Sequence, residues 1–182
     1  MTLRGALVWV VLTLAIAIPL IAAAQSPFLQ WRDPIYITAG FSGITALALL
    51  LVQPLLILGV LRGVPARRTH ACIGTGLVLA VLVHVAGLWI TSPPDVVDVL
   101  LFRSPTPFSI WGAVAMWAVF VAALLAAMRK RIGLRLWRVG HSIAVAVVII
   151  GTVVHAWLVE GAMEHVTKAA LCLMVLGVGA FV

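Results

Sequence analysis

Charged side chains are scarce in this chain of 182 residues, and acidic ones are the scarcest, with five Asp and Glu residues against twelve Lys and Arg residues. Charged residues make up 9% of the sequence, far below the roughly 25% of a soluble domain. Hydrophobic residues make up 64%, and the mean hydropathy is +1.24. So few charges cannot cover a water-facing surface, which excludes an ordinary soluble enzyme, a nucleic-acid-binding domain and a disordered chain.

Cysteine is also rare. The two cysteines, Cys72 and Cys172, both lie inside apolar runs, and neither belongs to a CxxC pair. This spacing excludes a disulfide framework and a zinc-ribbon pattern. We interpret both as small packing residues.

Long apolar stretches dominate what is present. Five of them, at residues 5–24, 35–61, 69–91, 108–128 and 137–159, reach the length of about 20 residues that a spanning helix needs. A sixth, at 166–182, would rise about 25 Å as a helix, and is either a short complete span or the start of a longer one. The runs are too continuous for barrel strands, which alternate over about 10 residues. The sequence therefore predicts an all-α, polytopic membrane bundle of six transmembrane helices, in a single domain covering residues 1–182.

The first stretch has a second interpretation. It begins after Arg4 and ends at Ala22-Ala23-Ala24-Gln25, which is similar to a secretory signal with a small-residue cleavage site. Its apolar run is longer than that of a typical signal peptide. We therefore expect a retained helix.

The positions of the charges predict an orientation. With six spans, one side of the membrane holds nine of the twelve basic residues and no acid: Arg4, Arg62, Arg67, Arg68, Arg129, Lys130, Arg131, Arg135 and Arg138. The other side holds Arg32, Arg103, Lys168 and all five acidic residues. Basic loops remain cytoplasmic, so we expect cytoplasmic N- and C-termini in a bacterial-type inner membrane. The positive charge thus indicates topology rather than nucleic-acid binding.

Four of the five histidines lie within or at the ends of predicted spans. His70 and His84 lie in 69–91, and His141 and His155 lie in 137–159. Ionisable residues in a membrane are costly and usually face a partner or a cavity. A structural role, in which these histidines only hydrogen-bond between the helices of a non-haem transporter or assembly subunit, stays open.

The spacing His-x13-His occurs in both spans. Fourteen residues turn a helix by about 1400°, or 40° short of four turns, and raise it by about 21 Å. Both histidines of a span therefore share a face. The two spans run in the same direction, so His70 and His141 form an inner level and His84 and His155 an outer level.

Two facing imidazoles at each of two levels meet the requirement for two bis-histidine haems stacked across a bilayer. Imidazole is a common metal ligand, and the protein ligands of a haem tune its reduction potential. One zinc ion cannot use all four histidines, because its ligands must converge on one point. A proton relay would not explain the matched spacing. Arg67 and Arg138 each precede an inner-level histidine by three residues. These arginines, together with Arg68, either bind haem propionates or anchor the helix ends at lipid headgroups.

The two Arg-x2-His-x13-His segments resemble the ferric reductase-like transmembrane domain superfamily, which includes NADPH oxidases, ferric reductases and the haem-binding membrane subunit of the bacterial methionine sulfoxide reductase system. Gly43-Ile44-Thr45-Ala46-Leu47 and Trp137-x3-His141 are also similar to the pattern of that superfamily. The resemblance covers the second to sixth predicted helices.

This resemblance implies transmembrane electron transfer through two b-type haems, with His70 and His141 holding the inner haem and His84 and His155 the outer haem. Oxidases of the superfamily carry a flavin and nicotinamide domain. No GxGxxG after a strand and no P-loop occurs in this sequence, so we expect no such domain in residues 1–182. A separate flavoprotein, or quinol, would then supply electrons, with the flavin or quinone arriving with the donor.

The sequence does not identify the electron acceptor. A periplasmic protein, a ferric chelate, quinone and oxygen all stay open. Glu160, Glu164 and His165 follow the outer-level His155 closely. They form either a solvated loop or a site for a hard cation such as ferric iron.

Overall fold

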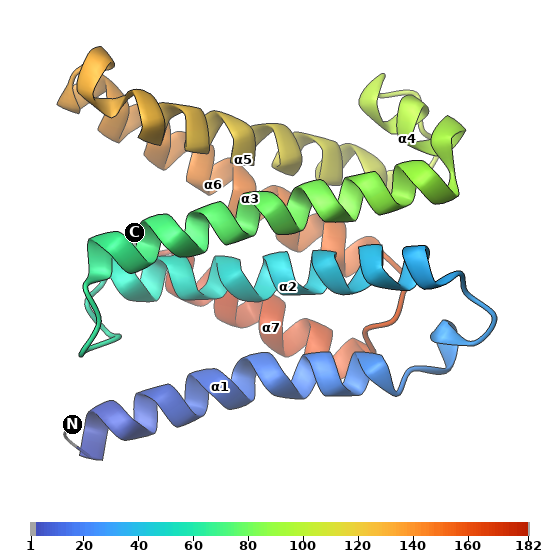
Figure 1. Ribbon diagram of the computed structural model, residues 1–182, viewed down its shortest axis with the longest axis horizontal. Helices are drawn as coiled ribbons and strands as arrows, with labels where there is room; N and C mark the ends of the chain where they lie inside the picture. The colour runs from blue at the N-terminus through green and yellow to red at the C-terminus, as the bar shows by residue number, and fades with distance from the viewer. Residues whose placement is uncertain (1–2, 182) are drawn as a thin grey trace.

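The computed structural model describes residues 3–181, and this range is helical with no strand (Figure 1). One 3-10 turn, η1, spans Pro27–Leu29. The α-helices are α1 (Leu3–Ala24), α2 (Pro34–Ile57), α3 (Ala66–Thr91), α4 (Pro93–Leu100), α5 (Pro107–Ile132), α6 (Leu134–Leu158) and α7 (His165–Gly179). Within this range α1, α2, α3, α5 and α6 are long and apolar enough to cross a membrane, whereas α7 is shorter. The all-helical, multi-pass prediction is confirmed; of the six predicted spans, five correspond to helices of spanning length and the sixth to the shorter apolar helix α7.

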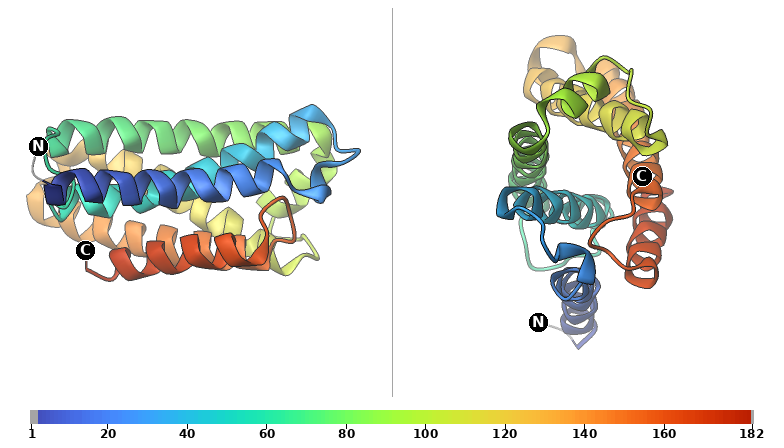
Figure 2. Two further views of the ribbon diagram at one scale, coloured as in Figure 1. Left: turned by 90° about the horizontal axis from the view of Figure 1, so that it is seen from below. Right: turned by 90° about the vertical axis from the view of Figure 1, so that its right-hand side faces the viewer.

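Two antiparallel helix pairs form the body of the molecule. α2 packs along α3, and α5 packs along α6; these are the most extensive contacts in the fold. α7 lies against both α2 and α6 and so joins the two hairpins, while α1 packs mainly on α7 (Figures 1 and 2). Contact between α3 and α5 is much smaller. The two hairpins are therefore held together along one side, by α7.

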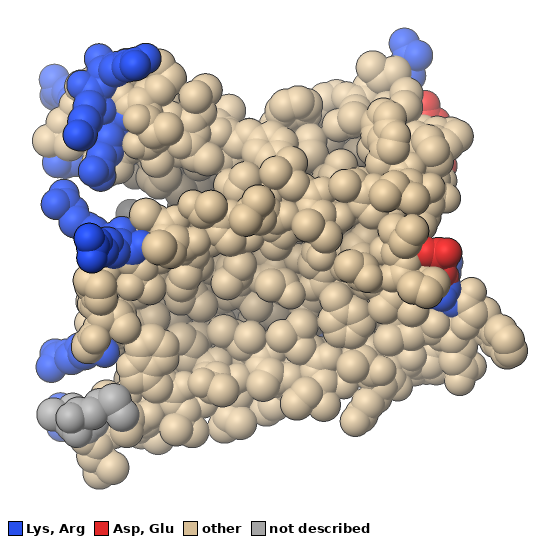
Figure 3. Space-filling view, in the orientation of Figure 1, with Lys and Arg blue, Asp and Glu red and all other residues tan. Residues whose placement is uncertain are grey.

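The charges divide between the two ends of this bundle. Lys and Arg gather at the end where α1, α3 and α6 begin, and the Asp and Glu visible in this view lie at the opposite end (Figure 3). We call these the basic end and the acidic end. The start of α1 and the end of α7 both lie at the basic end (Figure 2). Because α3 and α6 start at the same end, they run in the same direction, as the sequence predicted.

Helix ends differ from the predicted boundaries where turn chemistry intervenes. α2 ends at Ile57 rather than at residue 61, because Gly59 adopts a left-handed φ of 67°. The N–H of Gly59 donates to Leu56 and that of Val60 to Leu55, which is the glycine-terminated Schellman arrangement. Gly133, with φ of 81°, similarly separates α5 from α6.

The short helix α4 was not predicted. Its eight residues fall far short of the run of about 20 apolar residues that predicts a spanning helix. It begins after Ser92, whose hydroxyl donates to the carboxylate of Asp95 at 2.5 Å, and it lies at the acidic end, between α3 and α5 (Figure 1).

Close helix approach at small residues sets the geometry of both hairpins. A Cβ at Gly87 of α3 would lie 2.8 Å from the Cβ of Ala39 on α2, and one at Gly151 of α6 would lie 3.1 Å from the Cβ of Ala115 on α5. Small residues let membrane helices approach closely enough for backbone atoms to be reached across the interface.

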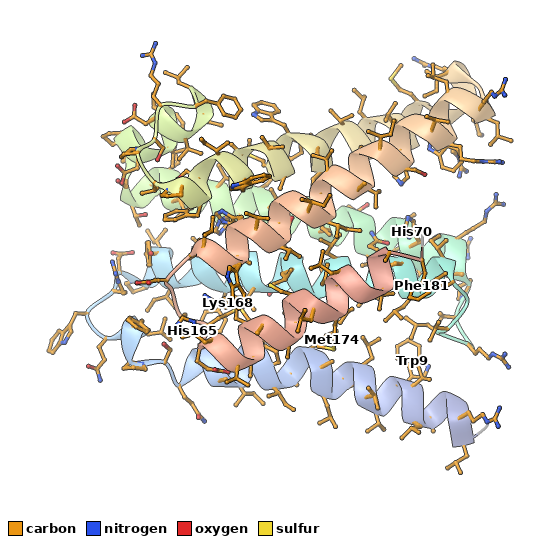
Figure 4. All side chains as sticks on the ribbon, turned by 180° about the vertical axis from the view of Figure 1, so that it is seen from behind. Trp9, His70, His165, Lys168, Met174 and Phe181 are labelled. Atoms are coloured by element: carbon orange, nitrogen blue, oxygen red, sulfur yellow. The ribbon has the colours of Figure 1, made fainter. Side chains whose placement is uncertain are left out.

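The start of α7 is fixed to the end of α6 at the acidic end. Lys168 is 3% exposed, and its Nζ donates to the carbonyl oxygens of Val159 at 2.9 Å and Trp157 at 3.4 Å. These carbonyls follow the last turns of α6, where helix carbonyls lack intrahelical partners. The amine of Lys168 therefore satisfies the end of α6 and attaches it to α7 (Figure 4).

We expect the substitution Lys168→Met to lower the melting temperature of the purified protein by roughly 3–10 °C, since a hydrogen bond from a charged donor contributes about 1.5–3 kcal/mol. Methionine keeps the aliphatic stem but leaves the two carbonyls without a donor. Thermal unfolding in detergent measures the effect, with the exposed Lys130→Met as the control. Equal melting temperatures for the two variants would show that the amine contributes nothing.

Candidate functional site

The outer-level histidines face each other across the two hairpins. The imidazole of His84 on α3 and that of His155 on α6 have their ring centroids 6.4 Å apart, and their planes are inclined at 77°. The structure thus brings together the two residues that the matched spacing assigned to one level.

Each of these rings is held by the backbone of its own hairpin partner. Nδ1 of His84 lies 2.8 Å from the carbonyl oxygen of Ala39 on α2, and Nδ1 of His155 lies 2.9 Å from that of Phe108 on α5. A carbonyl oxygen only accepts, so each Nδ1 carries the proton and donates, and each Nε2 keeps a lone pair. The two nitrogens of an imidazole point in nearly opposite directions, so each Nε2 is turned away from its partner helix and towards the other hairpin.

The inner level repeats this arrangement at the basic end. Nδ1 of His141 donates to the carbonyl oxygen of Ala122 on α5 at 3.1 Å. The imidazole of His70 contacts Gln53 on α2 and interacts electrostatically with His141. His70 and His141 therefore lie at the same level of the bundle.

The four contacts follow an internal repeat. The histidines of α3 are 14 residues apart, as are those of α6, and their partners Ala39 and Gln53, and Phe108 and Ala122, are also 14 residues apart. The α2–α3 hairpin and the α5–α6 hairpin thus present the same constellation to each other. Each level receives one imidazole from each hairpin.

Two glycines make room for the outer-level rings. A Cβ at Gly43 would lie 3.0 Å from Nδ1 of His84, and one at Gly112 would lie 2.7 Å from Nδ1 of His155. Each glycine lies four residues after the carbonyl that its histidine reaches, on the same face of α2 or α5. Glycine at these positions allows the ring to lie flat against the helix and reach the carbonyl.

At the inner level the indole of Trp137 supports the ring of His141. The two rings are stacked, with centroids 5.8 Å apart and planes inclined at 24°. The indole Nε1–H is buried without a hydrogen-bond partner among the described residues. An unpartnered buried donor is unfavourable unless a further group accepts from it.

The arginines that sequence analysis assigned to this level lie around it. Arg67 and Arg68 are exposed in the first turn of α3, and Arg138 is exposed near the start of α6. Their positions at the basic end fit both predicted roles, binding a haem propionate or anchoring the helices at headgroups.

The residues present fit a metal held between two imidazoles. A metal–imidazole bond of about 2.0–2.1 Å, with each ring nitrogen about 1.1 Å from its ring centre, separates two coaxial centroids by about 6.3 Å. The observed outer-level spacing is 6.4 Å. The Nδ1–H groups are already engaged, which fixes the tautomer that leaves Nε2 for a metal. The orphaned indole donor of Trp137 is a second sign of fit, at the inner level.

The outer loop does not gather a cation site. No group of three or more His, Cys, Asp or Glu residues within 3–181 is placed to hold a metal ion, so the hypothesis that Glu160, Glu164 and His165 bind ferric iron is not supported. The Glu164 carboxylate instead accepts from the backbone N–H groups of Val166 and Thr167 and caps α7. Hydrogen bonds from Thr167 and Val166 lower the pKa of Glu164, which keeps the cap charged.

The partners of the histidines do not follow from the sequence pattern. The carbonyls of Ala39, Phe108 and Ala122 leave no trace in a side-chain pattern, because any residue carries a carbonyl. Gln53 and Gly112 could have been found, since Gln53 is an amide inside an apolar run and Gly112 is a helix breaker inside one.

Comparison with known protein families identifies the family of this chain. Residues 40–152 match the family described as ferric reductase like transmembrane component. The chain belongs to this family. The match runs from within α2 to most of α6 and includes three of the four histidines; His155 lies three residues beyond it and is placed by the structure. Comparisons with curated proteins and with solved structures found no match.

The packing of the α5–α6 hairpin requires a residue without a side chain at Gly112. We expect Gly112→Ala to destabilise the purified protein by about 1–3 kcal/mol, as other overpacked substitutions do, because the new methyl group would push His155 off the Phe108 carbonyl. Thermal unfolding in detergent measures this. Gly40→Ala is the matched control, since nothing lies within 4 Å of a Cβ there. If both variants melt alike, the close contact at Gly112 is wrong.

Proposed function

We propose that this protein is a b-type dihaem cytochrome that carries electrons across the membrane, with His70 and His141 ligating the inner haem and His84 and His155 the outer one. The observation that carries the proposal is the outer pair, whose 6.4 Å spacing and engaged Nδ1 groups suit a bis-imidazole metal site. The family membership supports a membrane electron-transfer component.

Bound haem would supply the one-electron redox chemistry. The residues of the chain have other tasks. The backbone carbonyls of α2 and α5 orient the imidazoles, and hydrogen bonds of this kind raise the basicity of a ligand. Apolar helices around each level exclude water. The indole N–H of Trp137 and the exposed side chains of Arg67, Arg68 and Arg138 would donate hydrogen bonds to the propionate carboxylates of the inner haem.

We further propose that electrons enter at the basic end and leave at the acidic end. By the positive-inside rule the basic end is cytoplasmic, in a bacterial-type inner membrane. The exposed side chains of Arg129, Lys130 and Arg131 at the end of α5 would attract an acidic flavoprotein or an anionic donor, and quinol is the other candidate donor. At the acidic end the acceptor would be a periplasmic protein or a ferric chelate.

The ligand assignment predicts a pairwise pattern of haem loss. We expect about two b haems per chain in the purified protein, and about one after His84→Ala or His155→Ala, with the same spectral component lost in both. His70→Ala and His141→Ala should each remove the other component. Losing one of the two imidazoles would leave the haem at that level with a single protein ligand.

A pyridine haemochrome assay and reduced-minus-oxidised spectra of the four variants measure this pattern. A purified wild-type protein without haem would favour the non-haem alternative, in which the histidines only bond between helices. If the single variants His70→Ala and His155→Ala lost the same spectral component, the assignment of the histidines to levels would be contradicted.

The direction of transfer is tested in sealed, right-side-out vesicles that enclose a reductant and face an impermeant ferric chelate. We expect reduction of the chelate to fall to background in His70→Ala and in His155→Ala, since both levels lie on one path. Thr75→Val is the control, because the exposed Thr75 hydroxyl bonds only within α3. Reduction that persists in the histidine variants would contradict a path through these two levels.

A further inference from the structure

At Gln53 the internal repeat of the two hairpins is broken. At three of the four histidines, Nδ1 donates to a backbone carbonyl of the partner helix. At His70 the corresponding residue is Gln53, whose backbone hydrogen-bonds to the imidazole, but whose side-chain amide also lies against the same ring. Two groups of one residue therefore compete for Nδ1.

The amide has one favourable orientation. Its nitrogen then donates to Nδ1 of His70 at 2.6 Å and to the His70 carbonyl oxygen at 3.2 Å, and its oxygen accepts from the N–H of Gly74 at 2.9 Å. The reverse orientation would let the oxygen accept from an Nδ1–H of His70, but it would also set that oxygen against the His70 carbonyl and the nitrogen against the Gly74 N–H. Those like-with-like contacts hold the amide with its N–H groups towards the ring.

This orientation has a consequence for the proton on His70. An Nδ1 that accepts carries no proton, so the neutral imidazole holds its proton on Nε2. That tautomer has no lone pair at Nε2, the nitrogen that the other three histidines keep free. Metal binding through Nε2 of His70 therefore requires the amide N–H to leave Nδ1, so that a carbonyl oxygen of Gln53 can accept from it.

Resting on the proposed function, we propose that the Gln53 side chain is a positioning residue that weakens ligation by His70, so that the inner haem is the last to bind and the first to leave. The outer level has no such competitor. The two levels of an otherwise repeated structure thereby differ in how firmly they hold haem.

The experiment measures haem transfer from the purified holoprotein to excess apomyoglobin, with the inner component identified as the one missing in His70→Ala. We expect Gln53→Leu to slow loss of the inner haem about 10-fold, at the lower end of the roughly 10–100-fold effects of outer-shell changes. The Gln53 carbonyl would then be the only partner of Nδ1, as at the other three histidines. A side chain that merely supports His70 would give the opposite sign, faster loss.

A second variant keeps the test decisive if Gln53→Leu cannot be purified. In Gln53→Glu the carboxylate only accepts, so it favours the proton on Nδ1; we expect slower inner haem loss and a lower inner reduction potential, because the imidazole becomes a stronger donor. Thr75→Val on α3 is the control, and the outer component should be unchanged throughout.

The outcomes separate this inference from the proposed function. Wild-type protein with no haem overturns both. Two haems in the wild type, with inner loss unchanged or faster in the Gln53 variants, overturns only the role of Gln53. Slower loss confined to the inner component supports it.

Discussion

An imidazole N–H inside a membrane needs an acceptor, and in this protein the acceptor is the backbone of the neighbouring helix. Helix carbonyls already accept one bond within their own helix, but each oxygen has a second lone pair. Ala39, Phe108 and Ala122 offer that lone pair to a histidine. The small residues at the hairpin interfaces, the glycines beside the rings and the direction of every Nε2 all follow from bringing a ring within reach of a carbonyl.

The same constraint explains why the fold is built from two similar hairpins. One helix of each hairpin carries the histidines and the other supplies the acceptors, so neither helix is sufficient alone. Two hairpins facing each other then give two imidazoles at each level. α7 joins them along one side, and the bond from Lys168 to the end of α6 holds α7 in place. α1 lies outside this unit, on α7, and carries none of these residues.

Much of this arrangement could be predicted from the sequence because it depends on apolar length and on helix periodicity. The span positions, the parallel course of α3 and α6, and the pairing of His84 with His155 follow from counting residues. The end of α2 could not be placed by hydropathy, since Gly59 ends the helix inside an apolar run. α4 was not predicted because its eight residues are too few to form a long apolar run. The hypothesis of a cation site at Glu160, Glu164 and His165 relied on closeness in sequence, whereas the helix-capping demand of α7 engages the Glu164 carboxylate.

That three of the histidine partners are main-chain atoms affects how this site can change in evolution. No substitution removes a carbonyl group, so the partner positions tolerate any side chain small enough for the ring to approach. An insertion or deletion of one residue within α2 or α5 is different, because it rotates everything beyond it by about 100° and shifts it by about 1.5 Å. Two of the helices that carry no histidine should therefore vary freely in composition but hardly at all in length between their two partner residues.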